Sequence, residues 1–171
     1  MKKFVFLLTL VLSFNLQAEL ISQDDYGFEI KIEKTVPVSQ AKAYQQFLNV
    51  GQWWNAEHTW FGRSENLSIE AKAGGCFCEF NGDKQALHML VSYVHPNNEI
   101  RMIGGLGPLQ GLGVHGGMSW RFVKIDENKT KIIFNYKVVG RMEGGLKTLG
   151  PVVDGVLNIQ IMGLVSRVRQ S

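Results

Sequence analysis

The side chains in this sequence best suited to unusual chemistry are its two cysteines, Cys76 and Cys78, which stand two residues apart. Side chains at i and i+2 of a β-strand share one face. Three interpretations fit this spacing: two buried thiols acting as small apolar side chains, a disulfide, or a metal or reactive-thiol site. On an extended strand the two Cα atoms lie about 6.5–7 Å apart, which is near the upper limit for a disulfide.

The face that the cysteines occupy depends on the turn before them. Gly74-Gly75 has the composition of a two-residue hairpin turn. Such a turn places Cys78 opposite Ala71 and Phe80 opposite Ile69. Because Ala71 and Ile69 belong to the apolar side of their strand, we expect both cysteines to point inward.

A metal at the cysteines would need further ligands, and His58, His88 and His115 are the candidates. His88 falls on a strand expected over 87–94. The odd-numbered residues of this strand form its more apolar set, so we expect them to face inward and His88 to face outward. The sequence therefore predicts no bound metal and no cofactor.

Four aromatic residues, Trp53, Trp54, Trp60 and Phe61, accompany His58. They could simply close one end of the core. Alternatively, they could form the mouth of a cavity, where the rings contact a ligand and His58 anchors a polar group.

Sequence motifs for common enzyme chemistries are absent. Residues 111–116 fit the pattern G-x-G-x-x-G, but a strand-like segment at 118–122 follows, where a dinucleotide site needs a helix. The chain contains no G-x-S-x-G, H-E-x-x-H or phosphate-loop motif. Arg101 and Arg121 could neutralise a ligand carboxylate, although a solvated face suits them as well.

Most of these residues lie on expected strands. Apolar and polar residues alternate over 26–33, which predicts a half-buried strand. Ser39 can cap a helix that stops near Gly51, and the segment 53–62 fits a second, short helix. The alternation and the turns then predict six further strands, over 67–72, 76–80, 87–94, 99–103, 114–125 and 131–139.

The C-terminal segment predicts a long helix that begins near Leu146 or near Pro151. It is apolar over more than one face, so it must be covered on several sides, as a curved sheet would do. The antiparallel strands followed by a terminal helix indicate an α+β fold.

This order of elements resembles the START-like (SRPBCC) superfamily, which includes birch-pollen-allergen-like proteins, polyketide cyclases and dehydrases, and activators of heat-shock-chaperone ATPase. The segments 58–62, 74–79 and 104–109 also look like those of poorly characterised, polyketide cyclase-like bacterial members. The resemblance covers residues 26–169. It implies a helix-grip fold: a seven-stranded antiparallel sheet wrapped around the long C-terminal helix, with one or two short helices between the first and second strands.

Such a fold implies an internal cavity, and some relatives catalyse reactions in it while many only bind. The leading hypothesis is therefore binding of a small apolar molecule. The alternatives are a cyclase, dehydratase or hydrolase-type enzyme that uses His58, His115 or a thiol, and a protein-interaction module with a closed core. The predicted ligand-binding residues are Trp53, Trp54, His58, Trp60, Cys76, Cys78, Met118, Trp120, Phe134, Tyr136 and Val156.

The N-terminus has the layout of a secretory signal peptide. Lys2 and Lys3 precede an apolar run over 4–14, and a short polar stretch ends at Ala18. We therefore expect a signal at 1–18, a START-like domain over 19–171, and export, most simply to the periplasm. Without the two lysines the chain carries 16 basic and 15 acidic residues, a net charge of +1. This charge does not suit a nucleic-acid binder, and no membrane-spanning segment is expected in the mature chain.

Overall fold

The computed structural model describes residues 19–170, and its largest element is one eight-stranded antiparallel sheet. The signal peptide expected at 1–18 lies outside the described residues. The strand order is β1-β2-β8-β7-β6-β5-β4-β3. The strands are β1 Glu19–Asp24, β2 Gly27–Val36, β3 Leu67–Ile69, β4 Cys76–Asn81, β5 Lys84–His95, β6 Glu99–Ile103, β7 His115–Asp126 and β8 Lys129–Val139.

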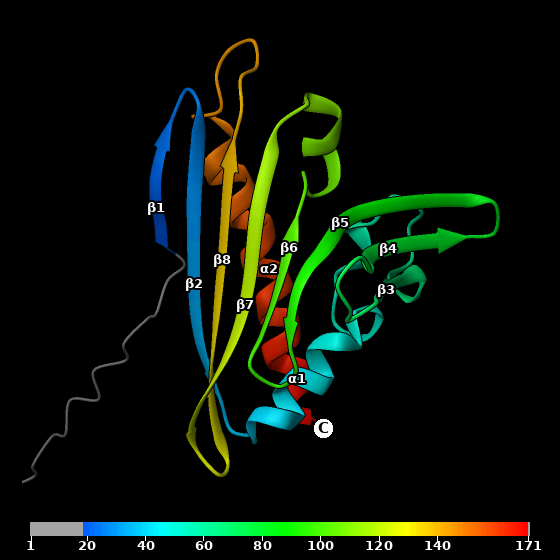
Figure 1. The fold of residues 1–171 in the computed structure, drawn as a ribbon, viewed down its shortest axis with the longest axis vertical. Helices are drawn as coiled ribbons and strands as arrows, with labels where there is room; N and C mark the ends of the chain where they lie inside the picture. The colour runs from blue at the N-terminus through cyan, green and yellow to red at the C-terminus, as the bar shows by residue number, and fades with distance from the viewer. Residues whose placement is uncertain (1–18, 171) are drawn as a thin grey trace, which may run out of the picture.

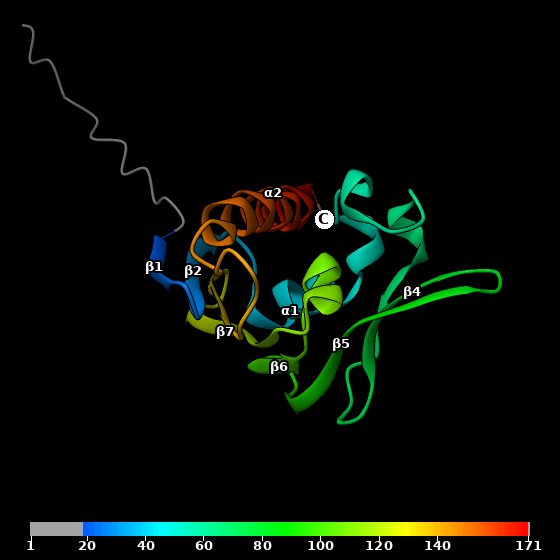
Figure 2. The same ribbon diagram turned by 90° about the horizontal axis from the view of Figure 1, so that it is seen from above.

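The sheet bends into an arc, and the long helix α2 lies across its open side (Figures 1 and 2). Helix α1 and three short turns of 3₁₀-helix connect β2 to β3, and a fourth 3₁₀ segment, η4, connects β6 to β7. The β4–β5 hairpin extends away from the body of the sheet (Figure 1). The helical segments are α1 Gln40–Leu48, η1 Val50–Gln52, η2 Ala56–His58, η3 Ser64–Asn66, η4 Gly107–Leu112 and α2 Leu149–Gln170. This arrangement is the helix-grip fold, so the predicted α+β class is confirmed.

Alternation along the central strands produces the core, as the sequence predicts. Ile30 of β2 and Met118 of β7 both pair with Tyr136 of β8, and Trp120 pairs with Phe134. All five side chains are buried, and the residues between them face outward or are only half-buried. The inner face of the arc is therefore apolar, and α2 covers it.

The sheet has one strand more than the seven expected. The additional strand, β1, pairs with β2 through the tight turn at Asp25–Tyr26. Its sequence, ELISQD, has only two adjacent apolar residues and no alternation. Backbone pairing at the sheet edge forms this strand without an apolar pattern, which explains why the periodicity does not predict it.

Both main helices begin as their sequences indicate. Ser39 caps α1, and its hydroxyl accepts a hydrogen bond from the backbone N–H of Lys42 at 3.4 Å. Helix α2 begins at Leu149, with Pro151 in the first turn, where proline is tolerated. Among the described residues α2 is the one helix with the length and hydropathy of a membrane span, but one of its faces packs against β2 and α1.

Candidate functional site

A cavity of about 350 Å³ lies beside the first half of α2. Helix α2 forms one wall, the η4 segment a second, the chain around η2 a third, and β4 and β5 the floor. Its lining is mainly apolar. The lining residues are Trp54, Glu57, His58, Thr59, Trp60, Phe77, His88, Leu106, Gly107, Pro108, Leu109, Leu112, Leu149, Val152, Val153, Val156 and Leu157.

Tyr136 anchors the loop that carries η4. Its hydroxyl accepts a hydrogen bond from the backbone N–H of Leu106 at 2.9 Å and donates one to the carbonyl of Gly104 at 3.3 Å. Burial raises the pKa of Tyr136 to about 12, so the hydroxyl keeps its proton at neutral pH. The core residue Tyr136 therefore holds the wall of the cavity in place.

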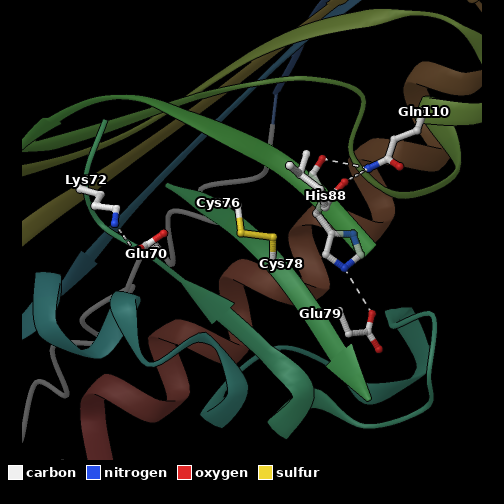
Figure 3. Close-up of a disulfide and its surroundings, with 8 residues drawn as sticks. Glu70, Lys72, Cys76, Cys78, Glu79, His88 and Gln110 are labelled. Atoms are coloured by element: carbon white, nitrogen blue, oxygen red, sulfur yellow. Dashed lines mark hydrogen bonds and ion pairs between the residues drawn. A yellow bond between two sulfur atoms is a disulfide. The ribbon is translucent and has the colours of Figure 1, made fainter. Parts of the chain in front are cut away.

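Glu79 of β4 is a fully buried carboxylate behind this cavity. It accepts hydrogen bonds from the backbone N–H groups of Trp60 at 2.9 Å and Phe61 at 2.8 Å. Its Oε2 atom also lies 3.2 Å from Nε2 of His88 (Figure 3). These three partners satisfy the buried charge and tie the loop after η2 to the sheet.

His88 reaches Glu79 because β5 contains a β-bulge. Cys78 pairs with Leu87 and Phe77 pairs with Met89, which leaves His88 as an extra residue between them. A bulge re-aims a side chain in this way. The ring of His88 is only 5% exposed and lies 5.0 Å from the ring of Phe77.

The position of His88 corrects the sequence prediction. His88 was expected to face outward because Leu87 and Met89 were assigned to one inner set. The bulge breaks this parity: Leu87 faces outward and is 53% exposed, whereas His88 and Met89 are both buried. Burial lowers the pKa of His88, and the hydrogen bond that its ring donates to Glu79 opposes this shift. The imidazole is therefore neutral at pH 7.

His58, at the end of η2, is held by an amide on α2. The Oε1 atom of Gln160 accepts a hydrogen bond from the backbone N–H of Asn55 at 2.8 Å, which fixes the orientation of this amide. Its Nε2 atom therefore donates to Nδ1 of His58, at 2.6 Å. Trp54 contributes as well, since its indole N–H donates to the carbonyl of His58 at 2.9 Å.

The two cysteines form a disulfide, one of the three interpretations that the sequence left open. Their Cα atoms lie 5.4 Å apart. Phe77 between them lines the cavity, so Cys76 and Cys78, whose disulfide is drawn in Figure 3, lie on the opposite, outer face of β4. They pair with the exposed Leu90 and Leu87, although Cys78 itself is only 5% exposed. The expectation that the cysteines face inward is therefore wrong.

The error arises from the turn at Gly74-Gly75. The backbone N–H of Gly74 donates to Val91 of β5, so this segment belongs to a longer loop over 70–75 and is no hairpin turn. Ile69 therefore pairs with Phe77 instead of Phe80. The strand pairing is thus displaced by an odd number of residues from the predicted one, and such a displacement exchanges the two faces of a strand.

The remaining predicted ligand-binding residues fall into two groups. Trp54, His58, Trp60 and Val156 line the cavity. The other group packs deep in the arc, where only about 10 Å³ of void remains. Phe47, Trp53 and Trp120 fill that part with ring contacts of 4.9–6.2 Å. The predicted ligand-binding residues that are buried without lining the cavity are Trp53, Met118, Trp120, Phe134 and Tyr136.

Sequence reasoning missed Glu79, the inward orientation of His88, and three leucines at and before η4. These leucines, Leu106, Leu109 and Leu112, were the signal that the glycine-rich segment 104–113 covers an apolar space. Among the described residues, no group of three His, Cys, Asp or Glu side chains is placed to hold a metal ion.

An open groove of about 800 Å³ adjoins the cavity on the other side of His88 and Trp60. Leu87, Gln110 and His115 line it, among others. The Gln110 side chain donates hydrogen bonds to the carbonyls of Leu87 and His88 and thus joins η4 to β5 at the bulge (Figure 3).

Comparison with solved structures shows the same fold in proteins of low sequence identity. A protein of unknown function from Staphylococcus aureus is 13% identical, with a TM-score of 0.61 over 91% of this chain and 98% of that one. A norcoclaurine synthase mutant from Thalictrum flavum, in complex with a transition state analogue, is 16% identical, with a TM-score of 0.55 over 83% and 94%.

The di-domain ARO/CYC protein StfQ, from the steffimycin biosynthetic pathway, also matches. It is 14% identical, with a TM-score of 0.55 over 85% of this chain and 50% of that one. No family model matches the sequence, and no curated protein does. The similarity therefore establishes the helix-grip fold.

Proposed function

We propose that the protein binds a small, largely apolar molecule in the cavity beside α2. The observation that carries this proposal is the cavity itself: about 350 Å³ of space walled by leucines, valines and aromatic rings, within an otherwise closed core. A water molecule takes about 30 Å³ in the liquid, so the space suits a ligand of roughly ten to twenty non-hydrogen atoms. Apolar burial would supply most of the affinity.

A neutral fluorescent probe, N-phenyl-1-naphthylamine, tests this proposal. We expect its emission to rise when it is added to the native protein, and the tryptophan emission of the protein to fall, because Trp54 and Trp60 line the cavity. Replacing Val156 by Trp should fill the space and abolish uptake. Ile159→Trp is the matched control, since Ile159 lies on the same helix but is 48% exposed. Equal uptake by Val156→Trp and by the wild type would refute the proposal.

We further propose that the chain belongs to the START-like superfamily and is exported. The helix-grip neighbours support the first point, and one of them is a synthase and another an ARO/CYC protein. The layout of residues 1–18 supports export, as does a disulfide, which is typical of oxidising compartments. N-terminal sequencing of the protein from a periplasmic fraction should give a start at or near Glu19. A product that retains Lys2 and Lys3 would contradict export.

The Glu79–His88 pair favours one second function, acid–base catalysis in the same cavity. A neutral imidazole hydrogen-bonded to a carboxylate can act as a general base. Nδ1 of His88 would take a proton from the carbon beside a ketone carbonyl, while N–H of His58 would donate a hydrogen bond to the enolate oxygen that forms. Return of a proton to the same carbon restores the ketone.

In deuterium oxide this cycle replaces hydrogen by deuterium without any other change. Mass spectrometry of 2-acetylnaphthalene incubated with the protein should therefore show deuterium in the methyl group. The exchange should be lost in His88→Gln and kept in His95→Gln, because His95 is exposed at the end of β5. Exchange that is no faster than in buffer would leave binding as the function.

A further inference from the structure

The two histidines that line the cavity differ in the hydrogen-bonding group that each ring leaves free. His88 and His58 come from different walls, β5 and η2, yet both line the same space. Each has one ring nitrogen engaged by the protein, and the partner of that nitrogen determines what the other can do. The otherwise apolar cavity therefore has one hydrogen-bond acceptor and one hydrogen-bond donor among its lining histidines.

His88 offers an acceptor. Glu79 is a carboxylate, so the Nε2 atom of His88 donates to it and carries the ring hydrogen. Nδ1 then holds a lone pair, and no side chain among residues 19–170 is recorded as its partner. His88 lines the cavity, so this nitrogen can accept a hydrogen bond from a bound molecule or from water.

His58 offers a donor. Its Nδ1 atom accepts a hydrogen bond from the amide nitrogen of Gln160, whose orientation follows from the backbone N–H of Asn55. Because Nδ1 accepts this hydrogen bond, the ring hydrogen of His58 sits on Nε2. Gln160 is itself fully buried, which keeps this arrangement in place.

We infer that the ligand is a neutral molecule with a hydroxyl group, an alcohol or phenol, whose O–H donates to His88 and whose oxygen accepts from His58. This inference rests on the proposed binding function and adds the chemical class of the ligand. A hydroxyl is the smallest group that offers both a donor and an acceptor.

An anionic ligand fits the same site poorly. A carboxylate has acceptors only, so it would face the lone pair of His88 without a hydrogen bond. The buried charge of Glu79 lies directly behind that ring, and Glu57 lines the cavity as well. None of the described lining residues is Lys or Arg. The cavity thus selects against the negatively charged forms of apolar acids.

Three compounds of similar shape test the inference: 2-naphthol, 2-methylnaphthalene and 2-naphthoate. Each is titrated against protein that holds N-phenyl-1-naphthylamine, and displacement of the probe is measured. We expect 2-naphthol to bind about tenfold more tightly than 2-methylnaphthalene, the effect of one net hydrogen bond. We expect 2-naphthoate to bind most weakly.

The variant His88→Leu places an apolar side chain at this position and removes the acceptor. It should bind 2-methylnaphthalene as the wild type does, and the tenfold preference for 2-naphthol should disappear. His95→Leu is the matched control and should keep the preference. Equal affinities for naphthol and methylnaphthalene in the wild type would overturn the inference and leave the proposed function intact. Absence of probe uptake would instead refute the proposed function, and the inference with it.

A measurement on the wild type covers the case in which His88→Leu fails to fold. Nitrogen NMR distinguishes ring nitrogens that carry hydrogen from those that do not. We expect Nδ1 to lack hydrogen in both histidines. Addition of 2-naphthol should shift Nδ1 of His88 and Nε2 of His58, whereas 2-methylnaphthalene should leave both signals nearly unchanged. The same response to the two compounds would contradict the inference.

Discussion

Glu79 is the residue on which the local structure of the site depends most. Its carboxylate holds two consecutive backbone N–H groups, those of Trp60 and Phe61, and the ring of His88. None of these donors has another partner recorded among the described residues. A single buried side chain thus connects β4, β5 and the loop after η2, and it positions Trp60 at the rim of the cavity.

We predict that Glu79→Ala destabilises the protein strongly. The change leaves one buried donor, on His88, and two part-buried backbone donors without their acceptor. An unsatisfied buried donor costs about 1–3 kcal/mol, so the free energy of unfolding should fall by about 2–4 kcal/mol in urea titrations. Glu70→Ala serves as the control, because the ion pair of Glu70 with Lys72 is exposed and should matter little. If the two variants had equal stability, the proposed role of Glu79 would be wrong.

The buried His88 should make stability depend on pH. Its pKa is lowered in the folded state, so the unfolded chain binds more protons below the ordinary histidine pKa of about 6.5. The contribution of neutral His88 to the free energy of unfolding should therefore be complete above about pH 6.5. It should decline as the pH falls toward the pKa of His88 in the folded state. Among the described residues, the charged or titratable groups around His88 are Glu79 on β4, His58 and Glu57 of η2 across the cavity, and His115 of β7 in the adjoining groove.

Urea unfolding between pH 7.5 and pH 5 measures this dependence. The variant His88→Gln keeps a polar side chain that does not titrate, so its stability should fall less than that of the wild type over the same window. The comparison isolates the contribution of His88, because the other three histidines are present in both proteins. Parallel curves for the two proteins would contradict the prediction.

At the scale of elements, the disulfide and the bulge lie at the same point of the sheet. The cysteine Cα atoms are 5.4 Å apart, against about 6.5 Å for two residues of an extended strand. Across from this short stretch, β5 passes from Leu87 to Leu90 with His88 as the extra residue. The contraction of β4 on the outer face therefore accompanies the bulge that turns His88 toward the cavity.

We predict that loss of the disulfide alters the position of the His88 ring but lowers the free energy of unfolding only slightly. A loop of three residues contributes only about 1.6 kcal/mol in the chain-entropy model. The double variant Cys76→Ser, Cys78→Ser should therefore stay folded, while the NMR signals of the His88 ring shift and the preference for 2-naphthol weakens. Reduced wild-type protein should behave in the same way. Unchanged His88 signals would show that the bulge is independent of the disulfide.

The elements also show where sequence reasoning succeeded. Strands β2, β7 and β8 follow simple alternation, and their inner residues, such as Ile30 and Phe134, were predicted correctly. Alternation fails at β4 and β5 because it carries no information about an irregular loop over 70–75 or a bulge at His88. Both features depend on backbone hydrogen bonds between distant segments, such as that from Gly74 to Val91.

For the whole molecule, the important feature is that the core is closed in one half and open in the other. Phe47, Trp53 and Trp120 fill the space between the arc and the C-terminal half of α2. Beside the N-terminal half of the helix, the smaller side chains of Val153 and Val156 leave the cavity. The sequence predicted a single space between sheet and helix, since residue types alone do not show which rings interlock.

Tryptophan substitutions in the two halves should therefore have opposite effects. The sequence predicted that Met118 and Val156 both contact the ligand, which would leave room for a tryptophan at either position. Met118 is instead buried among Trp53, Trp120 and Phe77, where only about 10 Å³ is free. Overpacking at such a site costs about 1–3 kcal/mol or more, so Met118→Trp should lower the urea midpoint clearly while the remaining folded protein still takes up the probe. Val156→Trp should keep the midpoint and lose the probe. If Met118→Trp blocked the probe at unchanged stability, the division of the core into a closed and an open half would be wrong.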